Sequence, residues 1–211
     1  MTFSAFKELI SKIENSTLPG RAAQLEMAPI ERVKELKDID VEKLNPREAA
    51  VLGLFYPKAE ETHLALILRK TYKGVHSAQI GFPGGKVEPE DRNLQQTALR
   101  ETEEEVGVTQ TDVSVFKELT RVYIPPSNFW VQPYLGTVDY SPEFVAQESE
   151  VEDILEVTLK DFLSDQNRIE QRITTSYATN INVPAFKLNG HIVWGATAMM
   201  LNEIKALLKK Q

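Results

Sequence analysis

Apolar residues near the start of the chain follow helical spacing, and later they change to the pattern of strands. Between Phe3 and Ile13 they lie three or four positions apart, which predicts an amphipathic helix that ends near Asn15. Residues 18–29 do not continue this spacing, and we expect them to be extended. The pattern leaves open whether this stretch packs back on the domain or reaches a partner subunit.

Runs of β-branched and other apolar residues, separated by turn-forming residues, predict strands through much of the remaining chain. Residues 49–56 and 63–69 form a hairpin-like pair on either side of a turn that begins at Pro57. Strands in both orders around two long helices favour an α/β fold with a mixed sheet sandwiched between helices. The other expected elements are strands at 113–124, 129–138, 154–157, 169–176, 183–187 and 191–193, and helices at 159–163 and 195–209.

The segment 94–106 carries the signals of a complete helix. Asn93 and Gln96, three residues apart, resemble a capping box, and Gly107 suits the position after the last turn. An apolar side of this helix must face a core. The residues on that side are Leu94, Ala98, Leu99, Thr102 and Val106.

Three carboxylates gather at the edge of the apolar side of this helix. At about 100° per residue, Glu101 and Glu105 lie roughly 40° apart, and Glu104 lies about 60° from Glu101. Glu103 points about 160° away from Glu101 and is interpreted as a solvated charge. The run of acids therefore contains three candidate metal ligands and one bystander.

Carboxylates gathered in this way favour a divalent cation, because like charges repel unless a cation lies among them. Arg100 can compensate only part of that repulsion. A glycine-rich loop at 81–86 leads toward the helix, and Gly84 and Gly85 let its backbone approach a metal and a diphosphate closely. The pattern predicts metal-assisted attack on a phosphate. A solvated acidic helix face is the alternative.

Composition and charge narrow the function classes. The formal net charge of −7 over 211 residues argues against a general nucleic-acid binder, which needs a basic surface. The absence of cysteine excludes disulfides, thiolate catalysis and cysteine–zinc sites. The first residues lack the pattern of a signal peptide, and no apolar run approaches the ~20 residues that span a bilayer. We therefore expect a cytoplasmic protein without a membrane or nucleic-acid partner.

The second half of the motif resembles the box of the Nudix hydrolases. That box reads Gly, five residues, Glu, seven residues, and then Arg-Glu-apolar-x-Glu-Glu-x-Gly-apolar. The first half departs from it: counting from Gly85, the acid is Asp91, and eight residues separate Asp91 from Arg100. The matching residues are Arg100, Glu101, Glu104, Glu105, Gly107 and Val108, with Thr102 in an apolar slot.

The expanded box resembles the coenzyme A pyrophosphatase branch of that family. Similar segments lie at 76–91, 127–133, 148–159 and 194–198, so the resemblance covers roughly residues 48–209. It implies a Nudix domain at 48–211, preceded at 1–47 by a helix and an extended segment. The substrate motif of this branch is incomplete, because Lys70, Gly74 and Ala78 stand where Ser, Arg and Gly are expected.

The resemblance also implies roles for individual residues. Glu101 and Glu105 would hold Mg²⁺ or Mn²⁺ together with the carbonyl of Gly84, and Glu104 would bind a second ion or activate water. Arg100 would orient the glutamates and could pair with Asp91. Glu150, or else Glu148, would be a further base. The implied substrate-binding residues are Arg69, Lys73, His76, Gly85 and Ser127.

Three functions are compatible with these residues. The first is hydrolysis of coenzyme A or its derivatives to 3′,5′-ADP and 4′-phosphopantetheine. The second is the same chemistry on another small nucleoside diphosphate derivative, such as ADP-ribose or a dinucleotide. The third is a Nudix-fold binding module without turnover. A homodimer is a further expectation.

Overall fold

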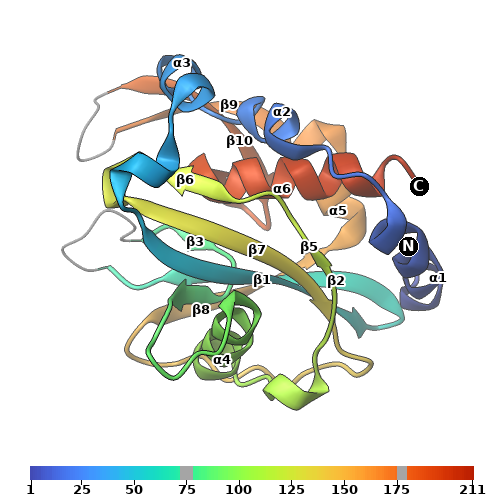
Figure 1. The fold of residues 1–211 in the computed structure, drawn as a ribbon. Coiled ribbons are helices and arrows are strands. Elements are labelled where there is room, and N and C mark those ends of the chain that lie inside the picture. Colours follow the sequence, from blue (N-terminus) through green and yellow to red (C-terminus); the bar gives the residue numbers. More distant parts are fainter. Residues whose placement is uncertain (72–77, 175–179) are drawn as a thin grey trace.

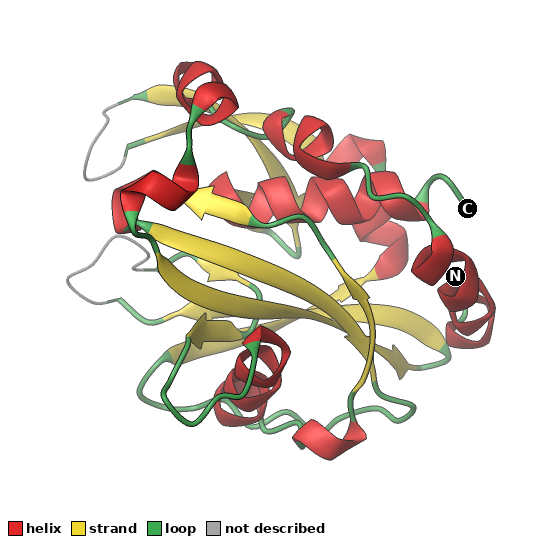
Figure 2. Cartoon of the chain, in the orientation of Figure 1, coloured by secondary structure: helices red, strands yellow, loops and turns green. Residues whose placement is uncertain are grey.

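The structure is a computed structural model that describes residues 1–71, 78–174 and 180–211 (Figures 1 and 2). Two positions expected to bind substrate, Lys73 and His76, lie outside the described residues, as does Gly74. The described strands form an eight-stranded mixed sheet and a separate three-stranded sheet.

Strand β1 (Arg47–Lys58) is the central strand of the large sheet. It pairs antiparallel with β2 (Glu61–Arg69) and parallel with β7 (Phe129–Thr137). Its side chains alternate between two cores, since Leu52 and Leu54 belong to one and Phe55 to the other. Burial on both faces explains its nearly continuous apolar sequence.

The other strands of the large sheet are β3 (Ile80–Gly81), β4 (Gly84–Lys86), β5 (Ser114–Glu118), β6 (Val122–Ile124) and β8 (Val151–Thr158), and in it β3, β2, β1, β7 and β5 follow one another. The small sheet contains β9 (Arg168–Ile173), β10 (Ile181–Leu188) and β11 (His191–Trp194) in the order β11-β10-β9.

The helices cover both faces of the large sheet. α4 (Leu94–Val106) packs on β1 and β4, while α6 and the small sheet lie on the opposite side (Figure 1). This arrangement confirms the predicted mixed sheet between helices. The other helices are α1 (Phe3–Asn15), α2 (Gly20–Leu25), α3 (Ile30–Asp38), α5 (Leu159–Leu163) and α6 (Gly195–Leu208), and the short 3₁₀ helices are η1 (Val41–Leu44), η2 (Gln110–Asp112), η3 (Pro125–Ser127) and η4 (Asp165–Asn167).

Helix α4 begins and ends as its sequence predicts. The Asn93 side chain accepts a hydrogen bond from the Gln96 amide at 2.9 Å, and Gly107 adopts a left-handed φ of 76°. The interpretation of Glu103 as a solvated charge was too simple. Its side chain is partly buried and accepts a 2.7 Å hydrogen bond from Gln110.

Two predictions of secondary structure were wrong. The expected extended segment at 18–29 contains α2 instead, because its short helix is stabilised by packing on α6 rather than by its own sequence. The expected strand at 113–124 divides into β5 and β6. It divides because the Leu119 carbonyl leaves the ladder and accepts a hydrogen bond from the Gln132 side chain at 2.7 Å.

None of the helices in the described parts of the chain combines the length and the apolar character that crossing a bilayer requires.

Candidate active site

The glycine loop is pressed against the centre of the sheet. Strand β4 pairs with β1, so that Gly84 lies opposite Val51 and Gly85 opposite Ala50. Gly84 has a φ of 149°, and a Cβ atom there would collide with the Ala50 carbonyl and the Val51 backbone. A Cβ at Gly85 would collide with the carboxylate of Glu101. Position 84 therefore requires glycine, and the absence of a side chain at position 85 allows α4 to bring the Glu101 carboxylate onto the loop.

Glu105 is buried beneath this loop and has two partners. Its side chain is 1% exposed, and its Oε2 accepts a 2.7 Å hydrogen bond from the Gly84 amide. Its Oε1 lies 3.3 Å from Arg69 Nη1 and accepts no hydrogen bond. Arg69 Nη2 in turn donates to the Gly84 carbonyl at 2.6 Å. The arginine thus lies between a carboxylate oxygen and a carbonyl that were both predicted to hold the metal.

Arg100 pairs with three carboxylates, those of Asp91, Glu101 and Glu104. Its guanidinium forms two 3.0 Å hydrogen bonds to Asp91, and its Nη1 lies 3.1 Å from Glu101 and 3.0 Å from Glu104. The side chain of Asp91 is fully buried and also accepts a hydrogen bond from Thr97. These contacts match the predicted pairing of Arg100 with Asp91 and the glutamates.

The electrostatics separate Asp91 from the glutamates. The hydrogen bonds from Arg100 lower the pKa of Asp91 to about 2. Burial raises the pKa of Glu105 to about 7, against the opposing effects of Arg69 and the Gly84 amide. Burial also raises the pKa of Glu101. Asp91 is therefore a fixed negative charge, whereas for the two glutamates the effect of burial outweighs the arginines that pair with them.

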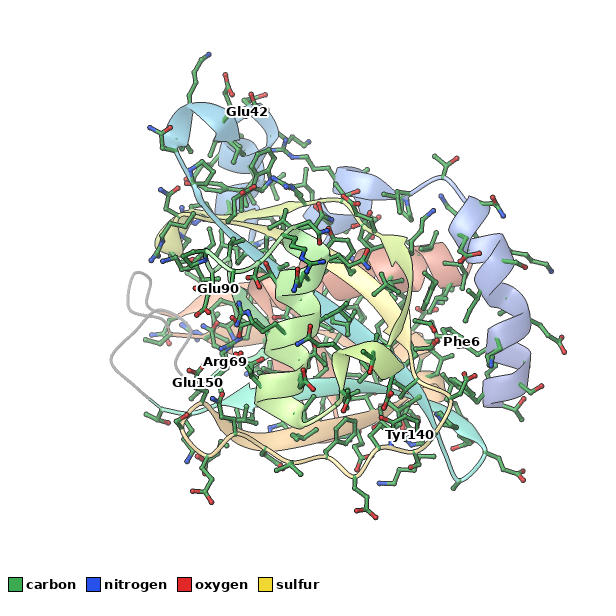
Figure 3. The ribbon with its side chains drawn as sticks, turned by 60° about the horizontal axis from the view of Figure 1, so that its bottom comes forward. Phe6, Glu42, Arg69, Glu90, Tyr140 and Glu150 are labelled. Atoms are coloured by element: carbon green, nitrogen blue, oxygen red, sulfur yellow. The ribbon has the colours of Figure 1, made fainter. Side chains whose placement is uncertain are left out.

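A cavity of about 480 Å³ opens beside these groups. Glu101 and Glu104 of α4 line it, as does Glu150, which precedes β8. Figure 3 shows Glu150 close to Arg69 beside α4, and the backbone links them, because the Lys70 amide donates to the Glu150 carbonyl at 2.9 Å. The cavity brings the three carboxylates to one opening.

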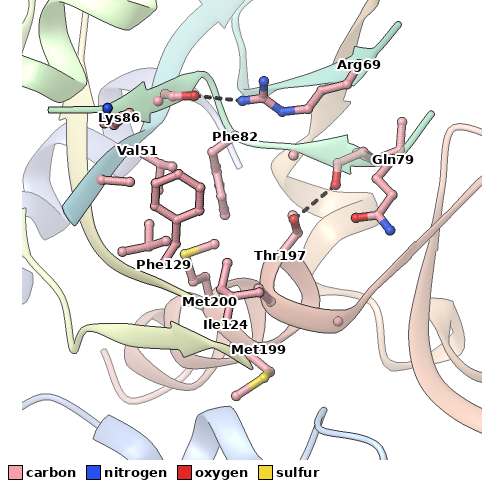
Figure 4. Close-up of a pocket in the computed structure, with 18 of the residues that line it drawn as sticks. Val51, Arg69, Gln79, Phe82, Lys86, Ile124, Phe129, Thr197, Met199 and Met200 are labelled. Carbon is pink, nitrogen blue, oxygen red and sulfur yellow. Dashed lines mark hydrogen bonds between the residues drawn. The ribbon is translucent and has the colours of Figure 1, made fainter. Parts of the chain in front are cut away.

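The cavity is apolar away from the carboxylates. Figure 4 shows Arg69 and Lys86 at one side, the rings of Phe82 and Phe129 in the middle, and Met199 at the far side. Met199 and Met200 of α6 are buried, and both also line this cavity. The site therefore combines a charged end and an apolar end.

The residues at the charged end suit a divalent metal. Within residues 1–71, 78–174 and 180–211, no three carboxylate or imidazole groups already converge as a ready metal site. Arg69 and Arg100 instead pair with the glutamates. The donors are hard oxygens, the Oε1 of Glu105 is buried without a hydrogen bond, and Gly85 leaves room for the carboxylate of Glu101. Glu101, Glu105 and the Gly84 carbonyl are the groups that would hold Mg²⁺ or Mn²⁺.

The expected substrate-binding residues are distributed unevenly. Arg69 and Gly85 line the cavity, and Ser127 does not, although the preceding Pro125 and Pro126 do. The Ser127 carbonyl accepts a 2.6 Å hydrogen bond from Arg47 instead. Glu148 and Glu150, the two candidate bases, are both exposed, but only Glu150 lines the cavity.

Several residues of the cavity were missed by sequence reasoning. Phe82 and Lys86 lie within the glycine loop, where their position offered a signal. The others were not among the residues to which the sequence assigned a role, and the fold brings them to the cavity. They include Pro29, Arg32, Leu36, Gln147, Trp194 and Thr197.

Comparisons with known proteins agree with this architecture. A model of the NUDIX domain matches residues 45–177. The chain is similar to an uncharacterized Nudix hydrolase, NudL, of Yersinia pestis (strain Pestoides F), with 32% identity over 158 residues that cover 75% of this chain and 78% of the relative.

Solved structures show the same fold. The Nudix hydrolase RenU from M. smegmatis aligns with a TM-score of 0.54 at 14% identity, covering 78% of this chain and 87% of that chain. A MutT/nudix family protein from Enterococcus faecalis aligns with a TM-score of 0.52 at 15% identity, covering 92% and 76%. From the domain match and the 32% identical relative, the chain belongs to the Nudix hydrolase family.

Proposed function

We propose that this chain hydrolyses the diphosphate linkage of coenzyme A or its derivatives, giving 3′,5′-ADP and 4′-phosphopantetheine. The observation that carries the proposal is the two-ended cavity. Its charged end gathers Glu101, Glu104 and Glu150, and its other end offers a long apolar surface. Such a cavity suits a diphosphate that joins a nucleotide to a weakly polar arm.

The residues of the charged end would divide the chemistry between them. Arg100 holds Glu101 and Glu104 in place, so that their carboxylates meet the substrate in fixed positions. A bound Mg²⁺ or Mn²⁺ would neutralise charge on the phosphoryl oxygens and lower the pKa of bound water. Water attacks one phosphorus, the bridging oxygen leaves with the other phosphate, and Glu104 or Glu150 takes the proton.

A second substrate class is favoured by departures within the substrate motif. Lys70 and Gly74 stand where the coenzyme A branch has Ser and Arg. These changes favour ADP-ribose or a dinucleotide as the alternative. At Ala78, however, the backbone has a left-handed φ of 53°, a conformation that suits the glycine expected there. The backbone at this position therefore keeps the conformation of the glycine that the motif has there, at a cost to alanine of about 1 kcal/mol.

The test is a product assay with purified protein and Mg²⁺ or Mn²⁺. The substrates are coenzyme A, acetyl-coenzyme A, ADP-ribose, NADH and diadenosine polyphosphates. Release of 3′,5′-ADP from coenzyme A well above the other turnovers supports the proposal. Preferential turnover of ADP-ribose or a dinucleotide would show that the proposed substrate is wrong and that the proposed reaction, hydrolysis of a diphosphate, is right.

Two variants of α4 separate catalysis from binding. Glu101→Gln should abolish turnover and leave binding of coenzyme A measurable by calorimetry. Glu103→Gln is the matched control, because Glu103 lies on the same helix and bonds Gln110 outside the cavity. If the unaltered protein binds coenzyme A and turns over nothing in the panel, it is a binding module.

A further inference from the structure

Part of the cavity wall comes from the N-terminal segment. Pro29, Arg32 and Leu36, at the start of and within α3, line the cavity, and Leu36 shares a second cavity with Met199, which lies at the side far from Arg69 and Lys86 (Figure 4). The three residues of the N-terminal segment precede the stretch 45–177 that matches the NUDIX domain. This part of the wall is therefore supplied by a part of the chain that the domain match does not include.

A second cavity of about 220 Å³ lies next to this wall. Leu36, Tyr123 and Met199 line both cavities, so their side chains form the partition between them. The other residues that line the second cavity are Arg21, Gln24, Leu25, Val41, Thr120, Arg121, Val122 and Trp130.

Two of the large polar side chains around the second cavity already have partners. Gln24 donates to Glu203 at 2.7 Å and to the Thr120 carbonyl at 2.8 Å. Arg121 bonds Gln132 and Glu48 at 3.1 Å. Thr120 also donates to Glu203, and Arg21 is exposed, so the rest of the lining offers a ligand mainly apolar surface, which favours an apolar occupant.

Hydrogen bonds between α2 and α6 fix the backbone next to the partition. Glu203 of α6 is fully buried and accepts hydrogen bonds from the Gly20 amide at 3.1 Å and from Gln24. Asn202 donates to the Ala23 carbonyl at 2.7 Å. These buried bonds hold α2 against α6 and thereby place the chain that leads to α3. The adjustable parts of the partition are its side chains, and methionine in particular adapts its shape readily.

We propose that Leu36 and Met199 determine how long an apolar arm the substrate carries beyond its diphosphate, and that the second cavity receives the end of that arm. This inference rests on the proposed function. With the diphosphate at the carboxylates, an arm that follows the apolar floor past Phe82 and Phe129 reaches Met199, which lines both cavities as Leu36 does. The matching substrates are acyl thioesters of coenzyme A, whose acyl chain ends the phosphopantetheine arm.

The test compares two variants in which one side chain of α3 is shortened to alanine. Leu36→Ala opens the partition, whereas Val33→Ala removes apolar bulk from a partly buried residue that lines neither cavity. The values of kcat/KM are measured for coenzyme A and for acetyl, hexanoyl, decanoyl and palmitoyl thioesters. We expect Leu36→Ala to raise the ratio of decanoyl to acetyl turnover by about tenfold or more, because pocket contacts of a few methylenes discriminate at that level. Val33→Ala should leave this ratio unchanged.

An unchanged chain-length profile in folded Leu36→Ala protein would overturn the inference. Because Leu36 belongs to the core, Leu36→Val provides a milder variant with the same expected direction if the alanine variant does not fold. Calorimetry with decanoyl-coenzyme A separates the two proposals. If Leu36→Ala binds decanoyl-coenzyme A more tightly than the unaltered protein but neither protein turns it over, only the proposed reaction is rejected. If Leu36→Ala does not bind it more tightly, the role of Leu36 in the partition is rejected.

Discussion

At the scale of single residues, Arg69 has an unexpected place. Its guanidinium lies between the Gly84 carbonyl and Glu105 Oε1, two of the oxygens expected to hold a metal. A cation in this position neutralises a carboxylate that is 1% exposed, which would otherwise be costly. A divalent ion that takes the same oxygens must displace the arginine from them. Arg69 is then free to contact the diphosphate in the cavity that it lines.

Replacing Arg69 should therefore strengthen metal binding. In Arg69→Gln, the dissociation constant for Mn²⁺ measured by calorimetry is expected to fall by about tenfold, because a competing charge at contact distance is removed. Arg92→Gln has the same change in net charge at an exposed position before α4 and should bind Mn²⁺ as the unaltered protein does. Weaker Mn²⁺ binding in Arg69→Gln would show that the arginine supports the metal site instead.

A second residue-scale prediction concerns Asp91. Its pKa of about 2, below the usual 3.8, means that the charged form stabilises the folded chain by about 2 kcal/mol above pH 4. Asp91→Asn should lose about this amount of unfolding free energy in urea at pH 7, and the loss should shrink as the pH falls from 4 toward 2. Glu104→Gln removes a more exposed partner of Arg100 and should cost less than 1 kcal/mol. Equal losses in the two variants would contradict this ranking.

At the scale of elements, the site depends on how closely α4 approaches β4. Glycine at position 85 allows the carboxylate of Glu101 to lie directly on the loop. Gly85→Ala is expected to displace the carboxylate of Glu101 from the loop and to weaken Mn²⁺ binding by about tenfold or more, since small misplacements of ligands are costly. Gly81→Ala is the control, because a Cβ there meets its nearest neighbour, on Arg69, at 3.8 Å. Similar Mn²⁺ affinities in both variants would refute the packing argument.

The elements also show which features the sequence could predict. The start, the end and the acidic edge of α4 were predictable because their signals lie within about fifteen residues of one another. Helix α2 was missed because its stability comes from Glu203, far along the chain. The pairing of Arg69 with Glu105 was missed for the same reason, since only the packing of α4 on the sheet brings them together. Local signals predicted elements, and long-range contacts determined the walls of the site.

At the scale of the whole molecule, the buried carboxylate makes stability depend on metal and pH. Without metal, the pKa of Glu105 is about 7 in the folded chain and near 4.5 in the unfolded chain. Between these values the folded chain retains a proton that the unfolded chain has released. The free energy of unfolding therefore falls as the pH rises through this window, by up to about 3 kcal/mol.

This dependence can be measured by urea unfolding of the metal-free protein between pH 4.5 and pH 8. Glu105→Gln removes the titrating group, so its curve should lack the part of the fall that Glu105 contributes. Saturating Mg²⁺ should have the same effect in the unaltered protein, because the ion stabilises the charged carboxylate. Parallel pH curves for the unaltered protein and Glu105→Gln would contradict the assignment.

The contact between the two ends of the chain has a consequence for synthesis on the ribosome. Gly20 and Gln24 bond Glu203, so the segment that is made first finds its partner only when the last helix has left the ribosome. The centre of the large sheet also forms only after β7 has been synthesised, because β1 pairs in parallel with β7, about eighty residues later in the chain. The carboxylates of α4 can thus be in place before the wall at Leu36 exists. The nascent protein would pass through a stage in which the carboxylates that would hold the metal are in place, while the cavity is still open and does not select substrates by the length of their apolar arm.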